Sequence, residues 1–253
     1  MNAPQNLIRD PAVRSHRKAQ KEQALLRFLR QHIWSTQDIL QQVMGLASRQ
    51  AAHKSLTTLE KQGLLRRHIY ETLGGKLTVW GITHQGQAHA FQVDTETIIT
   101  TCFEPSRVSE QTIHHQLDLQ KLRLTAERSG WTNWVDGDRI NIQDKNLKRP
   151  DAIVRHPSGS VVAIECERTF KSLKRYEQIL IQYLKWLKAG QVHEVVWLSP
   201  TDDMAKRLQA IITSIKEVRI QGQKVLIEPE RHHAHLHFCS YVQWKNFTFL
   251  HKD

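Results

Sequence analysis

The sequence predicts an α+β protein, with an N-terminal winged helix-turn-helix followed by an α/β sandwich. Apolar residues recur at helical spacing through residues 18–63, and two β-rich runs joined by glycines follow them. From residue 109 onward the expected elements run helix, strand, strand, strand, helix, strand, helix, strand. We therefore expect four parts, which are a flexible basic arm at 1–17, the winged helix at 18–92, a linker at 93–108 and the second domain at 109–253.

The whole-chain composition indicates a polyanionic partner. The 253 residues carry a net charge of +11, which favours nucleic acid over an acidic membrane surface. The cysteines, Cys102, Cys166 and Cys239, form no CxxC pair, so we interpret them as reduced core residues and not as a zinc site or a disulfide framework. No apolar run approaches the ~20 residues that span a bilayer, and the first residues lack the apolar core of a signal peptide. We expect a cytoplasmic protein without membrane insertion.

Three helices are predicted after the arm. The first is defined by apolar residues at helical spacing, namely Ala24, Leu25, Phe28 and Leu29. Ser35 or Thr36 is the expected N-cap of a short second helix that ends at Gly45. Ser48 is the expected N-cap of the third helix, which stops at Gly63.

Two strands and a further helix complete the first domain. The β-rich runs 64–70 and 76–82 are joined by Gly74 and Gly75, which is the chemistry of a hairpin turn. Thr83 starts another helix. Three helices followed by a hairpin are typical of a winged helix, in which the hairpin is the wing.

The third helix of such a domain enters the major groove of DNA through its outer face. The outer side chains expected here are Arg49, Gln50, His53, Lys54 and Thr57. Arg49 and Gln50 suit guanine and adenine edges. The wing residues expected to contact phosphates are Arg66, Arg67 and Lys76. The alternative is that the three helices form a structural or dimerisation module.

The second domain begins with a predicted helix at 109–128, with Ile113, Leu117 and Leu124 facing inward, and a strand at 131–142. After the hairpin described next come a helix, a strand, a helix and a strand, at 170–187, 193–200, 202–217 and 224–229. The inward residues expected on the helix at 170–187 are Leu173, Tyr176, Leu180, Tyr183, Leu184 and Leu187.

Residues 149–168 predict a hairpin that gathers acidic side chains. Asp151 stands at the start of the first strand, and Glu165 and Glu167 at the end of the second. Side chains alternate across a strand, so the two glutamates are expected on one face while Cys166 points the other way. Three carboxylates at one sheet edge repel each other unless a cation neutralises them. Oxygen ligands of this kind suit Mg²⁺ or Mn²⁺, and the alternative is an amphipathic hairpin with a solvated acidic rim.

Pro150-Asp151, the hairpin and Glu165-Cys166-Glu167 resemble the core motif of the PD-(D/E)xK nuclease superfamily. With a helix-turn-helix ahead of it, the arrangement is similar to MobC-type (MOB-C class) plasmid mobilisation relaxases and to replication-relaxation proteins. This resemblance implies a restriction-endonuclease-like fold for the second domain, an acid on its first helix for which Glu110 is the candidate, and a bacterial cytoplasmic location. The usual lysine after the second acid is replaced by Glu167, so Lys171 or Lys174 is expected to supply the missing cation.

The segment RHHAHLHF at 231–238 offers a rival constellation. On a strand, His233, His235 and His237 would share one face, which is metal-ligand spacing. This resembles the His-hydrophobe-His motif of tyrosine relaxases and rolling-circle initiators, and Tyr176 and Tyr183 lie on a preceding helix. Against it, those tyrosines fall on the apolar face of their helix, where packing accounts for them, and the acidic hairpin is left without a role. The alternative to a metal-binding motif is a strand whose histidines are solvated or face DNA.

The expected function is metal-dependent, site-specific DNA nicking at a plasmid transfer origin, with a replication origin as the other expected target. In this hypothesis Asp151 and Glu165 hold Mg²⁺ or Mn²⁺, and Glu167 completes or orients the metal's ligand shell. The expected partners are double-stranded and locally single-stranded DNA, together with accessory mobilisation and coupling proteins that the resemblance implies. The alternative is a non-catalytic DNA-binding regulator of plasmid replication or transcription with a degenerate nuclease fold.

Overall fold

The computed structural model describes residues 10–72, 74–91, 101–140, 148–220 and 222–249. The fold is a mixture of helices and sheets in two compact units, 1–120 and 121–253. The division falls inside helix α5 (Glu110–Arg128). Among the described residues, no helix combines the length and apolarity needed to cross a membrane.

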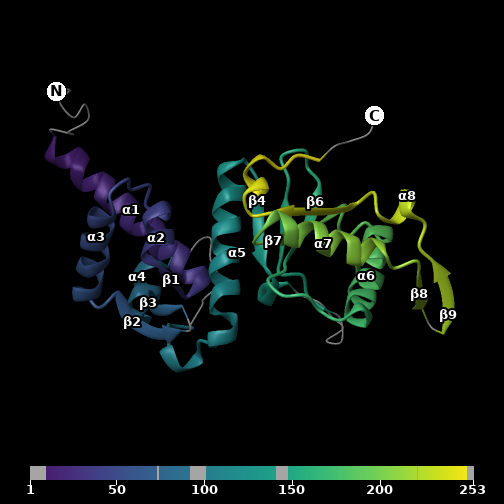
Figure 1. The fold of residues 1–253 in the computed structure, drawn as a ribbon. Helices are drawn as coiled ribbons and strands as arrows, with labels where there is room; N and C mark the ends of the chain where they lie inside the picture. The colour runs from purple at the N-terminus through teal and green to yellow at the C-terminus, as the bar shows by residue number, and fades with distance from the viewer. Residues whose placement is uncertain (1–9, 73, 92–100, 141–147, 221, 250–253) are drawn as a thin grey trace, which may run out of the picture. The chain divides into compact units, whose positions relative to one another are not determined.

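The first unit contains the four helices that the sequence predicts before residue 91: α1 (Pro11–His32), α2 (Gln37–Val43), α3 (Arg49–Lys61) and α4 (His84–Ala90) (Figure 1). Ser48 caps α3 as expected, because its Oγ accepts the Ala51 N–H, and Thr83, which was expected to start α4, accepts the Gly86 N–H through Oγ1. Thr36 is the N-cap of α2 but makes no side-chain capping bond. The expectation of a flexible arm through residue 17 is wrong for residues 11–17. They form the start of α1, which Asp10 caps by accepting the Ala12 N–H at 2.8 Å.

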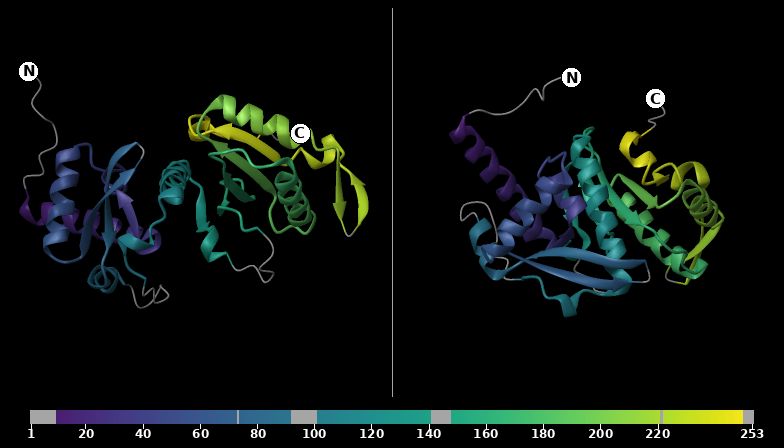
Figure 2. Two further views of the ribbon diagram at one scale, coloured as in Figure 1. Left: turned by 60° about the horizontal axis from the view of Figure 1, so that its bottom comes forward. Right: turned by 60° about the vertical axis from the view of Figure 1, so that its left-hand side comes forward.

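A three-stranded antiparallel sheet accompanies these helices, in the order β1-β3-β2. Strands β2 (Leu65–Thr72) and β3 (Gly75–Ile82) form the predicted antiparallel hairpin (Figure 2). Gly75 adopts a φ of 102° at the turn, a conformation that favours glycine. Strand β1 (Trp34–Thr36) was not predicted. The core of this unit comprises Leu25, Leu29, Ile39, Leu40, Leu56, Leu59, Trp80 and Ile82, and a short 3₁₀ turn, η1 (Pro105–Arg107), follows later in the chain.

The second unit is built on a five-stranded sheet in the order β10-β7-β6-β5-β4. Its strands are β4 (Thr132–Asp136), β5 (Ala152–Arg155), β6 (Val161–Cys166), β7 (Glu194–Ser199) and β10 (Leu236–Ser240). The β5–β6 hairpin confirms the predicted strand pair. Strands β6, β7 and β10 are parallel, so their carboxyl ends meet at one edge of the sheet, where ligands of such sheets commonly bind.

Two helices, α6 (Leu173–Lys188) and α7 (Asp202–Thr213), cover one face of this sheet (Figures 1 and 2). Tyr183 of α6 and Leu208 of α7 pack in one apolar cluster with Ala163 and Trp197 of the strands. Trp244, in the 3₁₀ turn η3 (Gln243–Asn246), donates its indole N–H to the carbonyl of Leu122 in α5 at 3.0 Å. The inward residues predicted for α5, Ile113, Leu117 and Leu124, are all buried.

Several expectations for the second unit are wrong. The strand predicted at 131–142 ends at Asp136 and is followed by a 3₁₀ turn, η2 (Gly137–Arg139). The helix predicted to reach 217 ends at Thr213, and the next residues form a separate hairpin of β8 (Glu217–Ile220) and β9 (Gln223–Leu226) that stands off from the main sheet (Figure 1). Leu173, expected to face inward, is 49 % exposed, because it is the first residue of its helix, just after the cap Ser172.

Candidate active site

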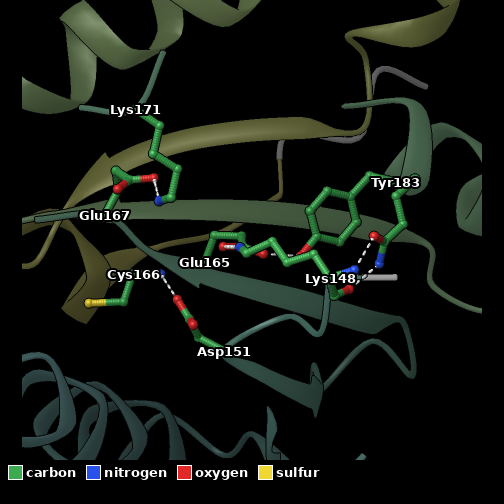
Figure 3. Close-up of polar contacts among 8 residues, drawn as sticks. Lys148, Asp151, Glu165, Cys166, Glu167, Lys171 and Tyr183 are labelled. Carbon is green, nitrogen blue, oxygen red and sulfur yellow. Dashed lines mark hydrogen bonds and ion pairs between the residues drawn. The ribbon is translucent and has the colours of Figure 1, made fainter. Parts of the chain in front are cut away.

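Asp151 and Glu165 lie side by side at the open end of the β5–β6 hairpin. Ala152 pairs with Ile164, so the residues one step beyond them, Asp151 and Glu165, face each other. The Asp151 N–H donates to the Ile164 carbonyl at 3.0 Å, and Asp151 Oδ2 accepts the Cys166 N–H at 2.7 Å (Figure 3). Glu165 is only 2 % exposed, whereas Asp151 is half-buried. The hairpin therefore brings these two carboxylates together as the sequence suggested.

The backbone of Gly137 packs closely against the backbone just before this carboxylate pair. Its N–H donates to the Asp151 carbonyl at 2.9 Å, and a Cβ added at this position would lie 2.2 Å from the Pro150 carbonyl oxygen. Any other residue would therefore push the backbone of Pro150 and Asp151 away. The close approach of two backbones is the reason for glycine here.

Lys148 is the cation that sequence reasoning missed. Its ammonium forms an ion pair with Glu165 Oε2 (Figure 3). Its backbone is held as well, because the Lys148 N–H donates to Gln182 Oε1 at 2.8 Å and the Lys148 carbonyl accepts from Gln182 Nε2. Burial opposes the charge on Lys148, but Glu165, Asp151 and Glu167 outweigh burial and raise its pKa. A protonated lysine thus lies within the field of all three acids.

Glu165 has a second partner in Tyr183 of α6, whose hydroxyl donates to Glu165 Oε1. Both side chains are almost completely buried. Burial raises the pKa of Glu165, and Lys148 and Tyr183 only partly offset it. Burial also raises the pKa of Tyr183, and the neighbouring carboxylate adds to the effect. Glu165 is therefore an acid whose charge depends on the cation beside it.

Glu167 forms a separate arrangement beyond the end of β6. Its N–H donates to the Leu198 carbonyl at 2.8 Å, and its carboxylate forms an ion pair with Lys171 (Figure 3). The Lys171 N–H in turn donates to the Tyr176 hydroxyl at 3.0 Å, and burial raises the pKa of Tyr176 to about 12. Strand β6 ends at Cys166, one residue before Glu167. The two glutamates hold different lysines, Lys148 for Glu165 and Lys171 for Glu167.

Two carboxylates of this site are suitable ligands for a hard divalent ion. Within the described residues, no three His, Cys, Asp or Glu side chains are grouped closely enough to hold a metal ion. Mg²⁺, however, is commonly bound by one or two carboxylates, with water and substrate phosphate as its other ligands. Asp151 and Glu165 meet that requirement. Lys148 occupies Glu165 Oε2, so an ion and the lysine ammonium compete for the same oxygen.

Two other residues predicted for this site, Lys174 and Glu110, are exposed. Lys174 is exposed in the first turn of α6. Glu110 is exposed at the first residue of α5 and belongs to the first unit. Their catalytic and metal-binding roles stay predictions.

Comparison with known proteins adds one finding. A family model described as replication-relaxation matches residues 26–195. The chain belongs to the replication-relaxation family. No curated protein matches the chain, and no solved structure matches it. The match includes the residues of the acidic hairpin, Lys148 and most of the first unit.

The histidine segment lies beyond the replication-relaxation match. The prediction of one strand carrying His233, His235 and His237 is wrong, because α8 (Pro229–His232) precedes His233 and β10 begins only at Leu236. His235 Nδ1 and His237 Nε2 lie 3.3 and 2.8 Å from the two carboxylate oxygens of Glu194. These imidazoles outweigh burial and lower the pKa of Glu194. Two of the three histidines are thus partners of one glutamate.

The predicted DNA-contacting residues lie on α3 and the β2–β3 hairpin. Arg49, Gln50, His53 and Lys54 are exposed on α3, as are Arg66, Arg67 and Lys76 on the hairpin, while Thr57 is half-buried. Arg49 lies 3.9 Å from Asp38, and His53 Nδ1 lies 3.2 Å from Gln37 Oε1. The Arg67 guanidinium lies 5.9 Å from the Trp80 ring. The proposed base and phosphate contacts of this family member stay predictions.

Proposed function

We propose that this member of the replication-relaxation family is a metal-dependent DNA nickase of the MobC relaxase type. In this proposal the first unit is a winged helix that selects a plasmid transfer origin, and the second is a PD-(D/E)xK-like nuclease domain. The observation that carries the proposal is the buried Glu165 beside Asp151, with Lys148 as its counterion. Burying an acid and a lysine costs several kcal/mol unless geometry and hydrogen bonds compensate, and such costs are typical of functional sites.

The two carboxylates and the lysines have separate tasks in this mechanism. Asp151 and Glu165 would hold Mg²⁺ or Mn²⁺, which supplies activation of water and stabilisation of charge on the scissile phosphate. Lys148, protonated beside Glu165, replaces the lysine that the motif lacks after its second acid. Glu167 orients Lys171, whose ammonium, or that of Lys174, stabilises the pentacovalent phosphorane.

The DNA partner of the proposed enzyme is duplex DNA that becomes locally single-stranded at the origin. The net charge of +11 supports a polyanionic partner. The exposed cations on α3 and the β2–β3 hairpin support duplex binding by the first unit. Accessory mobilisation and coupling proteins complete the proposal.

Conversion of supercoiled DNA into open circles tests this function. With a plasmid that carries the transfer origin, the purified chain should produce open circles when Mg²⁺ or Mn²⁺ is added and none in EDTA. Mapping the 5′ and 3′ termini of the nick should show one site on one strand. Binding of the origin without any cutting in either metal would contradict the proposed nuclease.

A second candidate is a DNA-binding regulator with a degenerate site. The observation that favours it is that Glu165 and Glu167 are each already neutralised by a lysine. Such a protein would bind its operator equally well with and without divalent ions. The same metal titration therefore separates the two candidates.

The tyrosine chemistry of the rival constellation gives a further prediction. Tyr176→Phe and Tyr183→Phe should both retain nicking, because the two rings are 1 % exposed and their hydroxyls are hydrogen-bonded inside the domain. Tyr183→Phe should also lower the free energy of unfolding by about 1–3 kcal/mol, since buried Glu165 loses a donor. Nicking assays and urea denaturation check both effects. Loss of all nicking in a stably folded Tyr→Phe variant would support a tyrosine nucleophile.

A further inference from the structure

A partly exposed aromatic ring follows the acidic site in the chain and is not used by the proposed mechanism. Phe170 is 38 % exposed, in the segment between Glu167 and α6. The Arg207 guanidinium, from α7, lies 4.9 Å from the centre of its ring. Phe170 is three residues after Glu167 and adjacent to Lys171, which binds Glu167. The ring therefore belongs to the same end of the sheet as the carboxylates.

The surroundings of Phe170 are strongly basic. The segment 168–175 contains four basic residues and no acidic one, namely Arg168, Lys171, Lys174 and Arg175. Lys206 and Arg207 add two more on α7, one turn after the acids Asp202 and Asp203 at the start of that helix. A partly exposed aromatic ring flanked by cations is complementary to one ligand chemistry in particular, a nucleobase joined to phosphates.

We infer that Phe170 and Arg207 form a binding site for an unpaired nucleotide of single-stranded DNA. The Arg207 guanidinium already lies over the ring, so the base stacks on the part of Phe170 that remains exposed, and Arg207 binds a phosphate next to it. Stacking on an aromatic side chain requires that the base be free of its partner strand, because the faces of paired bases are covered by their neighbours. The inference rests on the proposed function, since it assigns this site to the strand that is opened beside the carboxylates.

Binding without metal tests this site separately from nicking. The probes are a fluorescein-labelled oligo(dT) and a blunt duplex of the same length, titrated with the full-length chain in EDTA and followed by anisotropy. Phe170→Ala should weaken oligo(dT) binding by roughly tenfold, within the range measured for loss of one stacked base, and should leave duplex binding within about twofold. Phe170→Trp should restore oligo(dT) binding, because tryptophan also offers a stacking face.

Leu173→Ala is the matched control, because Leu173 is another exposed apolar side chain of the same stretch, 49 % exposed. It should bind oligo(dT) like the wild type. A fluorescent adenine analogue within the oligonucleotide should lose emission on binding the wild type and not on binding Phe170→Ala, since quenching reports stacking.

Three results would overturn the inference. The first is oligo(dT) binding by Phe170→Ala that equals the wild type. The second is an equal loss of oligo(dT) and duplex binding, which would indicate a general electrostatic or folding effect. The third is tighter binding of oligo(U) than of oligo(dT), which would assign the site to RNA. Absence of nicking in the metal assay, with these binding results intact, would contradict the nuclease and leave the stacking site standing.

Discussion

Asp151→Asn should lower metal-dependent nicking by about two to three orders of magnitude, the loss typical of removing one preorganised charge-stabilising group. The asparagine oxygen can still accept the Cys166 N–H, which Asp151 Oδ2 accepts at 2.7 Å. The hairpin end should therefore keep its shape. What is lost is the negative charge beside Glu165, and with it one of the two proposed metal ligands. The measurement is the initial rate of open-circle formation at saturating Mn²⁺.

Asp203→Asn is the control for this variant. It makes the same chemical change at an exposed position in the first turn of α7, and its nicking rate should match the wild type. Urea denaturation should give similar midpoints for both variants. A wild-type nicking rate in Asp151→Asn would remove Asp151 from the mechanism.

Lys148→Met should lower the free energy of unfolding at neutral pH by about 3–5 kcal/mol, the usual cost of removing one partner from a buried ion pair. Methionine keeps most of the length of the side chain but leaves Glu165, which is 2 % exposed, without its counterion. The Tyr183 hydroxyl remains as a single donor. Urea denaturation at pH 7.5 measures the loss.

The loss should shrink as the pH falls. Burial already raises the pKa of Glu165 above its ordinary value of 4.5, and removing Lys148 raises it further. Between the ordinary and the raised pKa, the folded variant binds a proton at Glu165 that the unfolded chain does not bind. The stability of Lys148→Met therefore falls as the pH rises through this window, and it recovers toward the wild type below it. Denaturation at pH 5 and pH 7.5 gives the difference.

Two further variants test whether the loss of stability comes from the ion pair between Lys148 and Glu165. Lys148→Met combined with Glu165→Gln should regain most of the stability, because glutamine is uncharged and its oxygen still accepts the Tyr183 hydroxyl. Lys174→Met, at an exposed position of α6, should change stability by less than about 0.5 kcal/mol. A Lys148→Met protein as stable as Lys174→Met would show that Lys148 and Glu165 are not paired in solution.

The sequence predicted those elements whose signals are local. The β5–β6 hairpin follows from two β-forming runs around a turn, and its pairing is as expected. The Ser48 cap and the helix start at Thr83 are predictable because a hydroxyl side chain at a helix start binds an amide only two or three residues away. The pairing of Asp151 with Glu165 follows from the hairpin alone, so that half of the candidate site was accessible from the sequence.

The other half depends on contacts between distant residues. Lys148 precedes the hairpin in a polar stretch without periodicity, and its position depends on Gln182, which is 34 residues further along the chain. The only local signal was a lysine three residues before Asp151. The expectation of a single strand carrying the histidines near residue 235 is wrong for a similar reason. Pro229 starts a short helix there, and Glu194 of another strand binds His235 and His237.

Gln182 presents both ends of one side-chain amide to the peptide groups of Lys148, accepting its N–H and donating to its carbonyl. Gln182 is itself buried in α6, as are Tyr183 and Trp186. The position of Lys148 is thus determined by α6 and not by the stretch of chain that contains the lysine. A shift or rotation of α6 by a fraction of a turn would move the Lys148 ammonium away from the Glu165 carboxylate. The packing of the buried apolar side chains of α6 therefore determines the position of this positive charge.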